Sequence, residues 1–360
     1  MSKILSIGTA VPAYCHPQDD ILQFMQAVYA PDDGARRKLR FLYAQSGIAR
    51  RYSVLPDFGR PPSEWRFFPA TEGLEPFPSL EQRMAVYHKQ APLLSVDAAR
   101  ACLKHNWEAG SITHLITVSC TGMSAPGLDL QVMELLGLRP DIFRTSVNFM
   151  GCYAALHGLR LADALCATDR NARVLVICTE LCTLHFQREG TMDNIASSLL
   201  FGDGSAAVLL APDDAPEDGL FIDGFHSEVL PKGRRDMAWE LSSTGFLMTL
   251  SGYIPDLVEG DFRPIVERAL ERQGVVAADV SHWCLHPGGK RILDAVNKSM
   301  GFAGEELSDS RSVLRDYGNL SSATVLFVLQ RMLEKKEPVR KLLAAAFGPG
   351  LTVETFTAHS

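Results

Sequence analysis

The sequence lacks the cysteine patterns of a metal site or of a secreted disulfide scaffold. Its eight cysteines are spread over 360 residues with no CxxC and no Cys/His ligand spacing, so we predict free thiols in a reducing compartment. Cys178 and Cys182 are four residues apart, but the segment VLVICTELC around them is typical of a strand leaving its sheet. We therefore expect no metal ion and a cytoplasmic location.

Long hydrophobic runs and large basic blocks are also missing. The N-terminal MSKILSIGTAVPAY is interrupted by Gly8 and Pro12, is too short for a signal-peptide core, and no segment reaches transmembrane length. The formal net charge is −7, and the basic residues form only short clusters such as ARRKLR (35–40) and KGRR (232–235). We expect no nucleic-acid partner and no membrane insertion, although these clusters can still meet small acidic ligands.

Apolar strands alternating with helices are what the sequence does contain. With 46% hydrophobic residues the chain can bury a large core, in two domains or in one duplicated unit. Six segments are typical of strands: 113–120, 173–180, 204–211, 282–289, 341–347 and 351–358. Strands that alternate with helical segments predict an α/β fold.

Spacing within the chain indicates an internal duplication. His114 and Cys152 are 38 residues apart, His282 and Asn319 are 37 apart, and the next strand begins 21 residues after Cys152 and after Asn319. The alternative is that all α/β sequences share such a pattern. The Asp/Pro-rich APDDAPEDG (211–219) separates the copies, so we predict two halves, 1–215 with the cysteine and 216–360 with a histidine and an asparagine.

Cys152, His286 and Asn319 are each expected at a turn between a strand and a helix, and a duplicated fold would bring these turns together. In SVNFMGCYAALHGLRLADAL (146–165) an apolar strand turns at Gly151 into a helix, and Cys152 sits at that turn. Each residue alone has a structural reading: the cysteine as packing, the histidine and asparagine as turn formers. Together, a thiolate stabilised by a helix N-terminus and an imidazolium, with His286 and Asn319 as an oxyanion hole, suit decarboxylative Claisen condensation without a cofactor. A papain-like protease also uses Cys, His and Asn, but its cysteine lies near the mature N-terminus.

Five motifs extend this interpretation to the whole chain. GCYAALHGLRLA, LFGDGSAAV (200–208), HPGGKRILDAV (286–296), YGNLSSATVLF (317–327) and AFGPGLTVET (346–355) resemble the type III polyketide synthase (chalcone synthase-like) family. The resemblance implies a thiolase fold with duplicated α-β-α-β-α layers, a homodimer, and acyl-CoA and malonyl-CoA as substrates. It makes Cys152 the nucleophile and His286 and Asn319 the decarboxylation pair.

The resemblance also implies a set of substrate-binding residues. Phe201 would be the gatekeeping aromatic, Ser321 of the YGNLSSATVLF motif would lie at the substrate, and the FGPG loop would line the site through Phe347, Gly348, Pro349 and Gly350. Lys38 and Arg40, before the RRY motif, would contact the CoA phosphates. A solvated helix face explains the same two basic residues.

Several of the implied pocket positions differ from the plant pattern. SCTGMSAPG (119–127) puts Cys120 and Thr121 at the wall and Ala125 where a methionine would cross the dimer interface. ELCTLHF (180–186) puts Cys182 and His185 at the cavity, Trp239 replaces a glycine, and Met248 stands for a second aromatic gatekeeper. For each of Cys120 and Cys182, core packing is the alternative reading.

These departures resemble bacterial members that accept fatty acyl starters. We therefore expect a bacterial-type polyketide synthase making alkylpyrone, resorcinol or related phenolic products. The alternatives are a ketoacyl-ACP synthase-like enzyme, which shares the three residues, and a catalytically inactive thiolase-fold scaffold.

Overall fold

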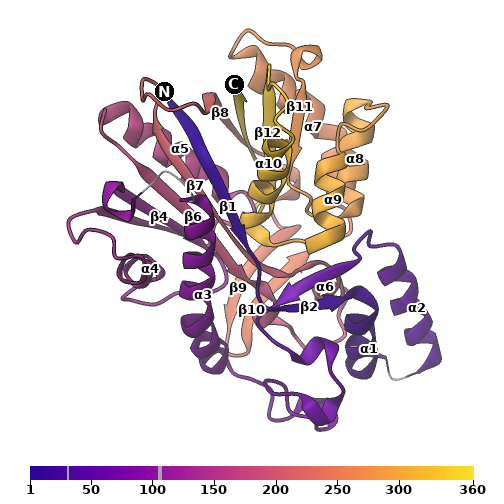
Figure 1. The fold of residues 1–360 in the computed structure, drawn as a ribbon. Coiled ribbons are helices and arrows are strands. Elements are labelled where there is room, and N and C mark those ends of the chain that lie inside the picture. Colours follow the sequence, from indigo (N-terminus) through magenta and orange to yellow (C-terminus); the bar gives the residue numbers. More distant parts are fainter. Residues whose placement is uncertain (31, 104–107) are drawn as a thin grey trace.

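Nine strands among the described residues form one long mixed sheet. The computed structural model describes residues 1–30, 32–103 and 108–360, and nine strands hydrogen-bond in the order β11-β12-β13-β8-β1-β7-β6-β4-β5 (Figure 1). Their bounds are β1 Ser2–Ala10, β4 His114–Ser119, β5 Phe143–Asn148, β6 Val174–Leu181, β7 Asp203–Pro212, β8 Leu220–Val229, β11 His282–Leu285, β12 Leu342–Gly348 and β13 Thr352–His359. Every segment predicted as a strand contributes to this sheet.

The strand pairing repeats on the two sides of the sheet centre. At the centre β1 pairs antiparallel with β8. On one side β7 pairs antiparallel with β1, β6 pairs antiparallel with β7, and β4 pairs parallel with β6. On the other side β13 pairs antiparallel with β8, β12 pairs antiparallel with β13, and β11 pairs parallel with β12. The duplication predicted from spacing is therefore a duplication of topology. The predicted division between residues 215 and 216 falls in the connection between β7 and β8.

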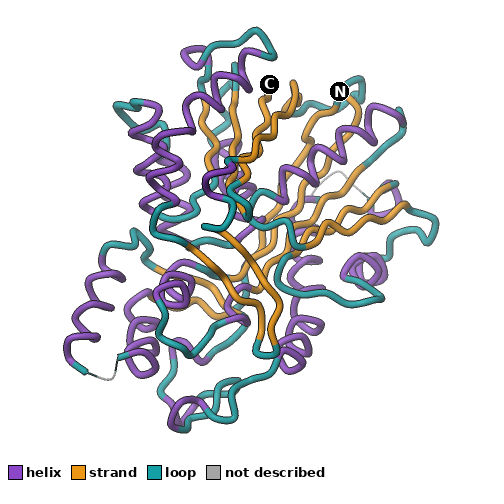
Figure 2. Tube along the Cα trace, turned by 180° about the vertical axis from the view of Figure 1, so that it is seen from behind, coloured by secondary structure: helices purple, strands orange, loops and turns teal. Residues whose placement is uncertain are grey.

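Helices cover both faces of each half and also separate the halves. Helices α5 (Ala154–Thr168) and α10 (Thr324–Glu334) lie between them, α3 (Leu80–Cys102) and α4 (Leu128–Leu136) cover the outside of the first, and α7 (Ile254–Glu271) and α8 (Lys290–Met300) cover the outside of the second (Figures 1 and 2). This is the predicted α-β-α-β-α layering. Helix α5 is rich in alanine and leucine, which favour helix, and a Cβ on its Gly158 would lie 2.9 Å from Val176 Cγ1, so the small residue permits close packing.

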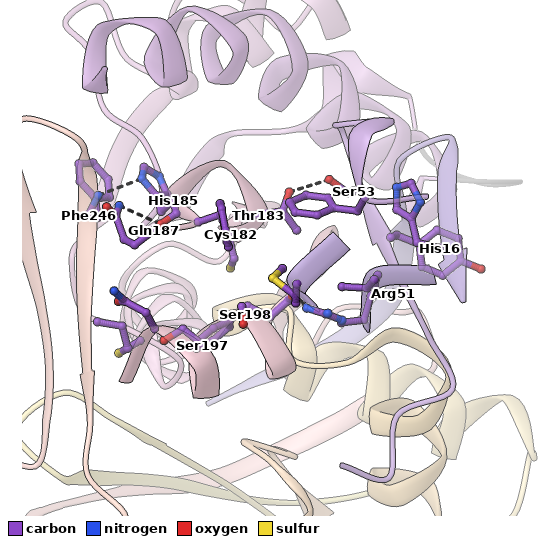
Figure 3. Close-up of a pocket in the computed structure, with 18 of the residues that line it drawn as sticks. His16, Arg51, Ser53, Cys182, Thr183, His185, Gln187, Ser197, Ser198 and Phe246 are labelled. Carbon is purple, nitrogen blue, oxygen red and sulfur yellow. Dashed lines mark hydrogen bonds between the residues drawn. The ribbon is translucent and has the colours of Figure 1, made fainter. Parts of the chain in front are cut away.

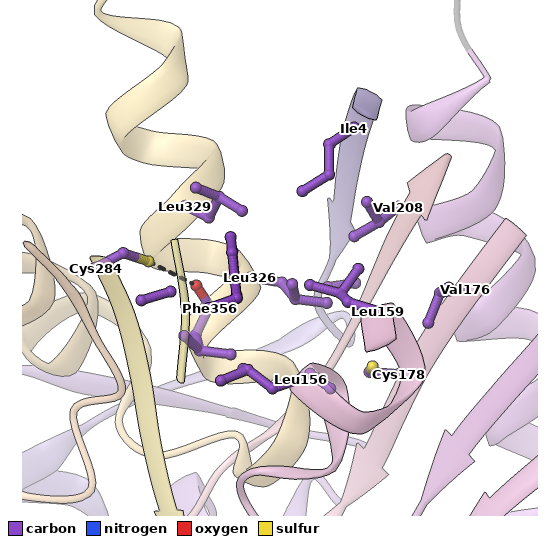
Figure 4. Packing of buried hydrophobic residues seen from close by; sticks show 14 of the residues in the cluster. Ile4, Leu156, Leu159, Val176, Cys178, Val208, Cys284, Leu326, Leu329 and Phe356 are labelled. Atoms are coloured by element: carbon purple, nitrogen blue, oxygen red, sulfur yellow. Dashed lines mark hydrogen bonds between the residues drawn. The ribbon is translucent and has the colours of Figure 1, made fainter. Parts of the chain in front are cut away.

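Buried strands direct successive side chains to different layers. On β6, Val176 and Cys178 pack into the inner core with α5, whereas Leu175 and Ile177 pack outward against α3 and α4. Such strands, apolar on both faces, appear in the sequence as continuous apolar runs. Figure 4 labels inner-core residues from both halves: Ile4, Leu156, Leu159, Val176, Cys178, Val208, Cys284, Leu326, Leu329 and Phe356.

One local prediction about the duplicated turns is wrong. We expected a strand before each helix, but Asn319 follows a helix, α9 (Ser308–Tyr317), where the first half has β5. The α9 segment SDSRSVLRDY buries Ser310, Val313 and Leu314 at helical spacing, so its pattern is amphipathic with a period of 3.6 rather than 2.

Smaller elements attach beside the sheet. They are the ribbon of β2 (Tyr14–Pro17) with β3 (Arg50–Ser53), the hairpin of β9 (Met237–Ser242) with β10 (Gly245–Leu250), and helices α1 (Gln18–Tyr29), α2 (Asp33–Ala44) and α6 (Met192–Leu200). In the hairpin, Trp239 and Met248 are paired directly. Among the described helices, none combines the length and apolar character needed to cross a membrane.

Candidate active site

The turn carrying Cys152 lies between β5 and α5 and packs tightly against the FGPG loop. Gly151 has φ +81°, and a Cβ there would lie 2.1 Å from Pro349 Cδ, so both conformation and space require glycine. A Cβ on Gly348 would likewise lie 2.4 Å from the Tyr153 ring. Cys152 itself is buried, and its Sγ lies 3.8 Å from Ser321 Oγ.

The expected resting thiolate is not what this environment favours. Burial raises the pKa of Cys152 to about 12, with hydrogen bonding by Ser321 only partly opposing it. Burial also lowers the pKa of His286 to about 3. Both shifts have the same cause, because each side chain is buried and its charged form loses its hydration. Burial therefore favours the neutral thiol and the neutral imidazole over the expected ion pair.

Asn319 is held so that its amide nitrogen faces the His286 loop. Its Oδ1 accepts from the backbone N–H of Ser321 at 2.8 Å and from Thr324 Oγ1 at 3.3 Å, and its Nδ2 donates to the carbonyl of Gly288 at 3.2 Å. Because a backbone N–H can only donate, Oδ1 must point toward Ser321. One Nδ2 proton remains for an incoming oxygen.

His286 completes this junction of the two halves. It follows β11, its imidazole is 1% exposed, and neither Nδ1 nor Nε2 has a hydrogen-bond partner. A Cβ on Gly288 would lie 3.7 Å from His286 Nε2. Buried polar atoms without partners are rare, and they mark places where a ligand completes the hydrogen bonding.

Sequence reasoning missed one buried acidic residue near the nucleophile, Glu180. Glu180 on β6 is fully buried, and it accepts from the backbone N–H of Cys120 at 2.9 Å, from Thr121 Oγ1 at 2.9 Å and from Ser322 Oγ at 2.5 Å. Burial raises its pKa to about 7. The signal was present in the sequence: a lone acidic residue ends the apolar strand VLVICTEL. Glu180 ties β4 and the Asn319 segment to β6.

Two adjoining cavities lie at this junction. The nucleophile cavity encloses about 390 Å³ of empty space including its mouth, and is lined by Cys120, Thr121, Gly151, Cys152, Cys182, Phe201, Met237, Trp239, Met248, Ser321 and Pro349. The inner cavity encloses about 600 Å³ on the same measure, between α6 and α1, and Figure 3 labels His16, Arg51, Ser53, Cys182, Thr183, His185, Gln187, Ser197, Ser198 and Phe246 in its wall. Cys182, Phe201, Trp239 and Met248 line both cavities.

His185 and Trp239 form a rigid part of this wall. His185 Nδ1 accepts from the backbone N–H of Phe246 at 3.1 Å, so its Nε2 carries the proton donated to the Thr121 carbonyl at 2.7 Å. Its ring stacks on Phe246 at 4.1 Å, and burial lowers its pKa to about 3. Trp239 Nε1 donates to the Cys120 carbonyl at 2.7 Å. Both side chains are neutral wall residues.

Six of the predicted binding residues do not line these cavities, and one of them is Gly348, which ends β12 against the Tyr153 ring. Phe347 packs at 5.5 Å from Phe262 in the outer core, because the pleat of β12 directs it outward. Gly350 supplies a turn with φ +73° whose N–H donates to Met237. Ala125 is exposed on this chain. Lys38 and Arg40 are exposed on α2, and the Lys38 ammonium contacts Met192 Sδ at 3.4 Å.

Sequence reasoning also missed the residues that cap α6. Gln18 Nε2 donates to the Leu199 carbonyl at 3.0 Å, and Arg51 Nη1 donates to the Phe201 carbonyl at 2.6 Å. Arg51 Nε in turn donates to Gln18 Oε1 at 2.9 Å. The backbone of Asn319 bridges the same turn, donating to Leu200 and accepting from Gly202 at 2.9 Å each. Phe201 and Asn319 therefore share one support. Arg51 belongs to the RRY motif, but we predicted binding residues, Lys38 and Arg40, only in the segment before that motif.

In the described part of the chain, no group of three or more His, Cys, Asp or Glu side chains is placed to hold a metal ion.

Comparison with known proteins gives matches along the chain. The family model described as chalcone and stilbene synthases, N-terminal domain, matches residues 1–214, and the model for their C-terminal domain matches residues 224–360. Among solved structures, PKS-I from the brown alga Ectocarpus siliculosus superposes with a TM-score of 0.93 at 27% identity, covering 100% of this chain and 98% of that one. The C-terminal type III polyketide synthase domain of Steely1, a type I/III hybrid from Dictyostelium, gives 0.91 at 28% identity, covering 100% and 99%.

Proposed function

Because this chain belongs to the chalcone and stilbene synthase family of type III polyketide synthases, which are acyltransferases that use malonyl-CoA, we propose that it extends an acyl-CoA starter at Cys152. CoA thioesters are the substrates, and the family needs no other cofactor. The observation that carries the site assignment is the buried constellation in which Cys152 Sγ lies 3.8 Å from Ser321 Oγ and Ser321 N–H holds Asn319.

The first step would be transfer of the starter to Cys152. As the starter thioester binds, the thiol proton passes to His286, whose ring nitrogens have no protein partner. Sulfur attacks the thioester carbon, the C–S bond to CoA breaks, and His286 returns its proton to the CoA sulfur, so CoA leaves as the thiol. The proton transfer creates an ion pair from two neutral groups, so it becomes favourable only when substrate reorganises the site.

Decarboxylation would then generate the carbon nucleophile. The bond between the malonyl methylene and its carboxylate breaks, carbon dioxide leaves, and the electron pair moves to the thioester oxygen as an enolate. The free Nδ2 proton of Asn319 and a proton on His286 stabilise that oxygen. The enolate carbon attacks the acyl-Cys152 carbonyl, a C–C bond forms, and the C–S bond to Cys152 breaks. Return of the extended chain to Cys152 starts the next cycle.

For the starter we propose a fatty acyl group, giving an alkylpyrone, resorcinol or related phenolic product. The inner cavity supports this because it adjoins the nucleophile cavity and carries apolar residues such as Met25, Phe58 and Phe186. Each methylene buried there would contribute about 0.8 kcal/mol.

We further propose that the enzyme is a homodimer through β5 and its neighbours. Phe143 on edge strand β5 is 72% exposed, and Leu135 and Met123 are 46% and 45% exposed. An edge strand with exposed large apolar side chains needs a covering partner. Ala125 lies in this surface. Any opening left by its small side chain would therefore lie at the dimer interface.

The test is turnover with malonyl-CoA and a panel of acyl-CoA starters, with products identified by mass spectrometry, for the wild type and Cys152→Ala. We expect malonyl-derived products from the wild type only. A ketoacyl-ACP synthase-like enzyme would extend once and require a carrier protein, and an inactive scaffold would release neither CoA nor carbon dioxide.

A further inference from the structure

The inner cavity has a polar stripe on one of its walls. Asn194, Ser197, Ser198 and Phe201 line it at the i, i+3, i+4, i+7 spacing of one helix face. A helix inside a protein normally turns its apolar face inward, whereas α6 turns three polar residues, Asn194, Ser197 and Ser198, toward the inner cavity. The Ser197 and Ser198 hydroxyls donate to carbonyls of their own helix, so they offer only lone pairs to the cavity.

Arg51 brings the one strong donor to this space. Its side chain enters the cavity near Ser198 (Figure 3) and the residue is 4% exposed. Nε and Nη1 are taken by Gln18 and by the Phe201 carbonyl. Nη2 is buried and has no hydrogen-bond partner. The Tyr43 hydroxyl donates to the Ser198 carbonyl at 3.4 Å and lies within hydrogen-bonding reach of the guanidinium, so its oxygen is a further neutral acceptor beside Arg51.

The guanidinium charge is not neutralised by a direct partner. Both acceptors that hold Arg51 are neutral, an amide oxygen and a backbone carbonyl. Asp203 acts on it from farther away, and its oxygens accept from Val54 N–H, Thr183 N–H and Thr183 Oγ1. A buried charge without a counter-ion is costly, and arginine binds carboxylates with charge-assisted hydrogen bonds.

We propose that the inner cavity binds an apolar chain ending in a carboxylate, and that Arg51 holds this carboxylate through Nη2. The apolar wall around Met25 and Phe58 receives the chain, and the shared wall at Cys182 and Phe201 connects it to the nucleophile. Where it concerns the starter, this inference rests on the proposed function: the starter is then the CoA monothioester of an α,ω-dicarboxylic acid.

The first experiment measures binding alone and needs no catalysis. Isothermal titration calorimetry of the full chain at pH 7.5 compares octanoate with methyl octanoate, which has the same chain without the charge. We expect octanoate to bind about 10- to 100-fold more tightly, as for a hydrogen bond to a charged group. Arg51→Gln should remove this difference. Arg50→Gln, the matched loss of charge at an exposed neighbour that pairs with Asp316, should keep it.

A third variant protects the test from folding defects. Ser197→Phe fills the cavity and leaves the Arg51 hydrogen bonds intact, so it should abolish binding of both ligands. Equal affinity for the two ligands in the wild type, no binding of either, or full octanoate binding to Ser197→Phe would each overturn the proposal. These results do not depend on Arg51→Gln folding.

The second experiment tests the starter. Single-turnover acylation of Cys152, followed by intact-protein mass spectrometry, compares suberyl-CoA with octanoyl-CoA, which have equal carbon numbers. The wild type should prefer suberyl-CoA about 10-fold or more, and Arg51→Gln should lose the preference while still loading octanoyl-CoA. An equal loss of Cys152 acylation with both starters would show that Arg51 only holds Phe201 in place, and it would overturn the proposal. Failure of all loading with octanoate binding retained would refute the proposed function and leave the cavity assignment standing.

Discussion

Replacing Asn319 separates its structural contacts from its proposed catalytic one. Asn319→Asp keeps an oxygen that accepts from Ser321 N–H and Thr324 Oγ1, now at 2.8 and 3.3 Å, but puts a second oxygen where Nδ2 now donates to Gly288. Asn319→Ala removes all three contacts. Both variants lose the proton assigned to the enolate oxygen.

The two variants should therefore match in catalysis and differ in stability. Loss of one oxyanion donor costs about 10²- to 10³-fold in rate, so carbon dioxide release from malonyl-CoA should fall by that factor in both. Asn319→Ala also leaves the buried Ser321 N–H without an acceptor, which costs about 1–3 kcal/mol of unfolding free energy. Asn319→Asp keeps that hydrogen bond, but it buries a carboxyl oxygen against the Gly288 carbonyl where Nδ2 now donates at 3.2 Å, so its loss of stability should be larger.

The assay compares two half-reactions in the same preparation. Release of carbon dioxide from carboxyl-labelled malonyl-CoA reports decarboxylation, and intact-protein mass spectrometry reports starter loading on Cys152. Loading should be nearly unchanged in both variants. An equal fall in loading and decarboxylation would refute the division of labour, and normal decarboxylation by Asn319→Asp would refute the donor role.

Three further results follow from burial and from the cavities. Because burial raises the pKa of Cys152 and disfavours its thiolate, alkylation mapped to Cys152 should keep rising from pH 6 to pH 10, and a plateau below pH 8 would show a preformed ion pair. Burial raises the pKa of Glu180 from 4.5 to about 7, so the folded state binds this proton more tightly, and the resulting stability is complete below pH 4.5 and lost as pH rises through 7. Relative to Glu180→Gln, the wild type should therefore lose up to about 3 kcal/mol between pH 5 and pH 8 in urea unfolding; a constant difference would contradict the shift. In starter competition, Ser197→Phe should shift the preference to short acyl-CoAs and Ala125→Phe should not, whereas the reverse result would place the chain at the dimer interface.

The fold could be predicted from the sequence because buried strands produce continuous apolar runs and the duplication produces repeated spacings. Strands such as β6 are apolar on both faces, so they stand out as continuous runs. The equal distances around Cys152 and Asn319 predicted the repeat seen in the strand pairing. The element before Asn319 was misassigned because an equal length of chain can be strand in one copy and helix in the other.

The site was less predictable because its chemistry depends on burial. A sequence shows that Cys152 precedes a helix but not that its surroundings exclude water, so the burial that raises its pKa could not be predicted. Phe347 was misplaced because its direction depends on the pleat of β12. Arg51 was missed because only tertiary packing makes a basic residue buried and partly unpaired. The catalytic roles of Cys152, His286 and Asn319 remain predictions.

One pulse-chase measurement tests the central claim most directly. The wild type is loaded with an acyl-CoA starter, malonyl-CoA is added, and the adduct is mapped by peptide mass spectrometry. The account predicts a starter thioester on Cys152 that is replaced there by species longer by malonyl-derived units. An adduct on Cys120 instead, or a Cys152 adduct that malonyl-CoA leaves unchanged, would contradict it.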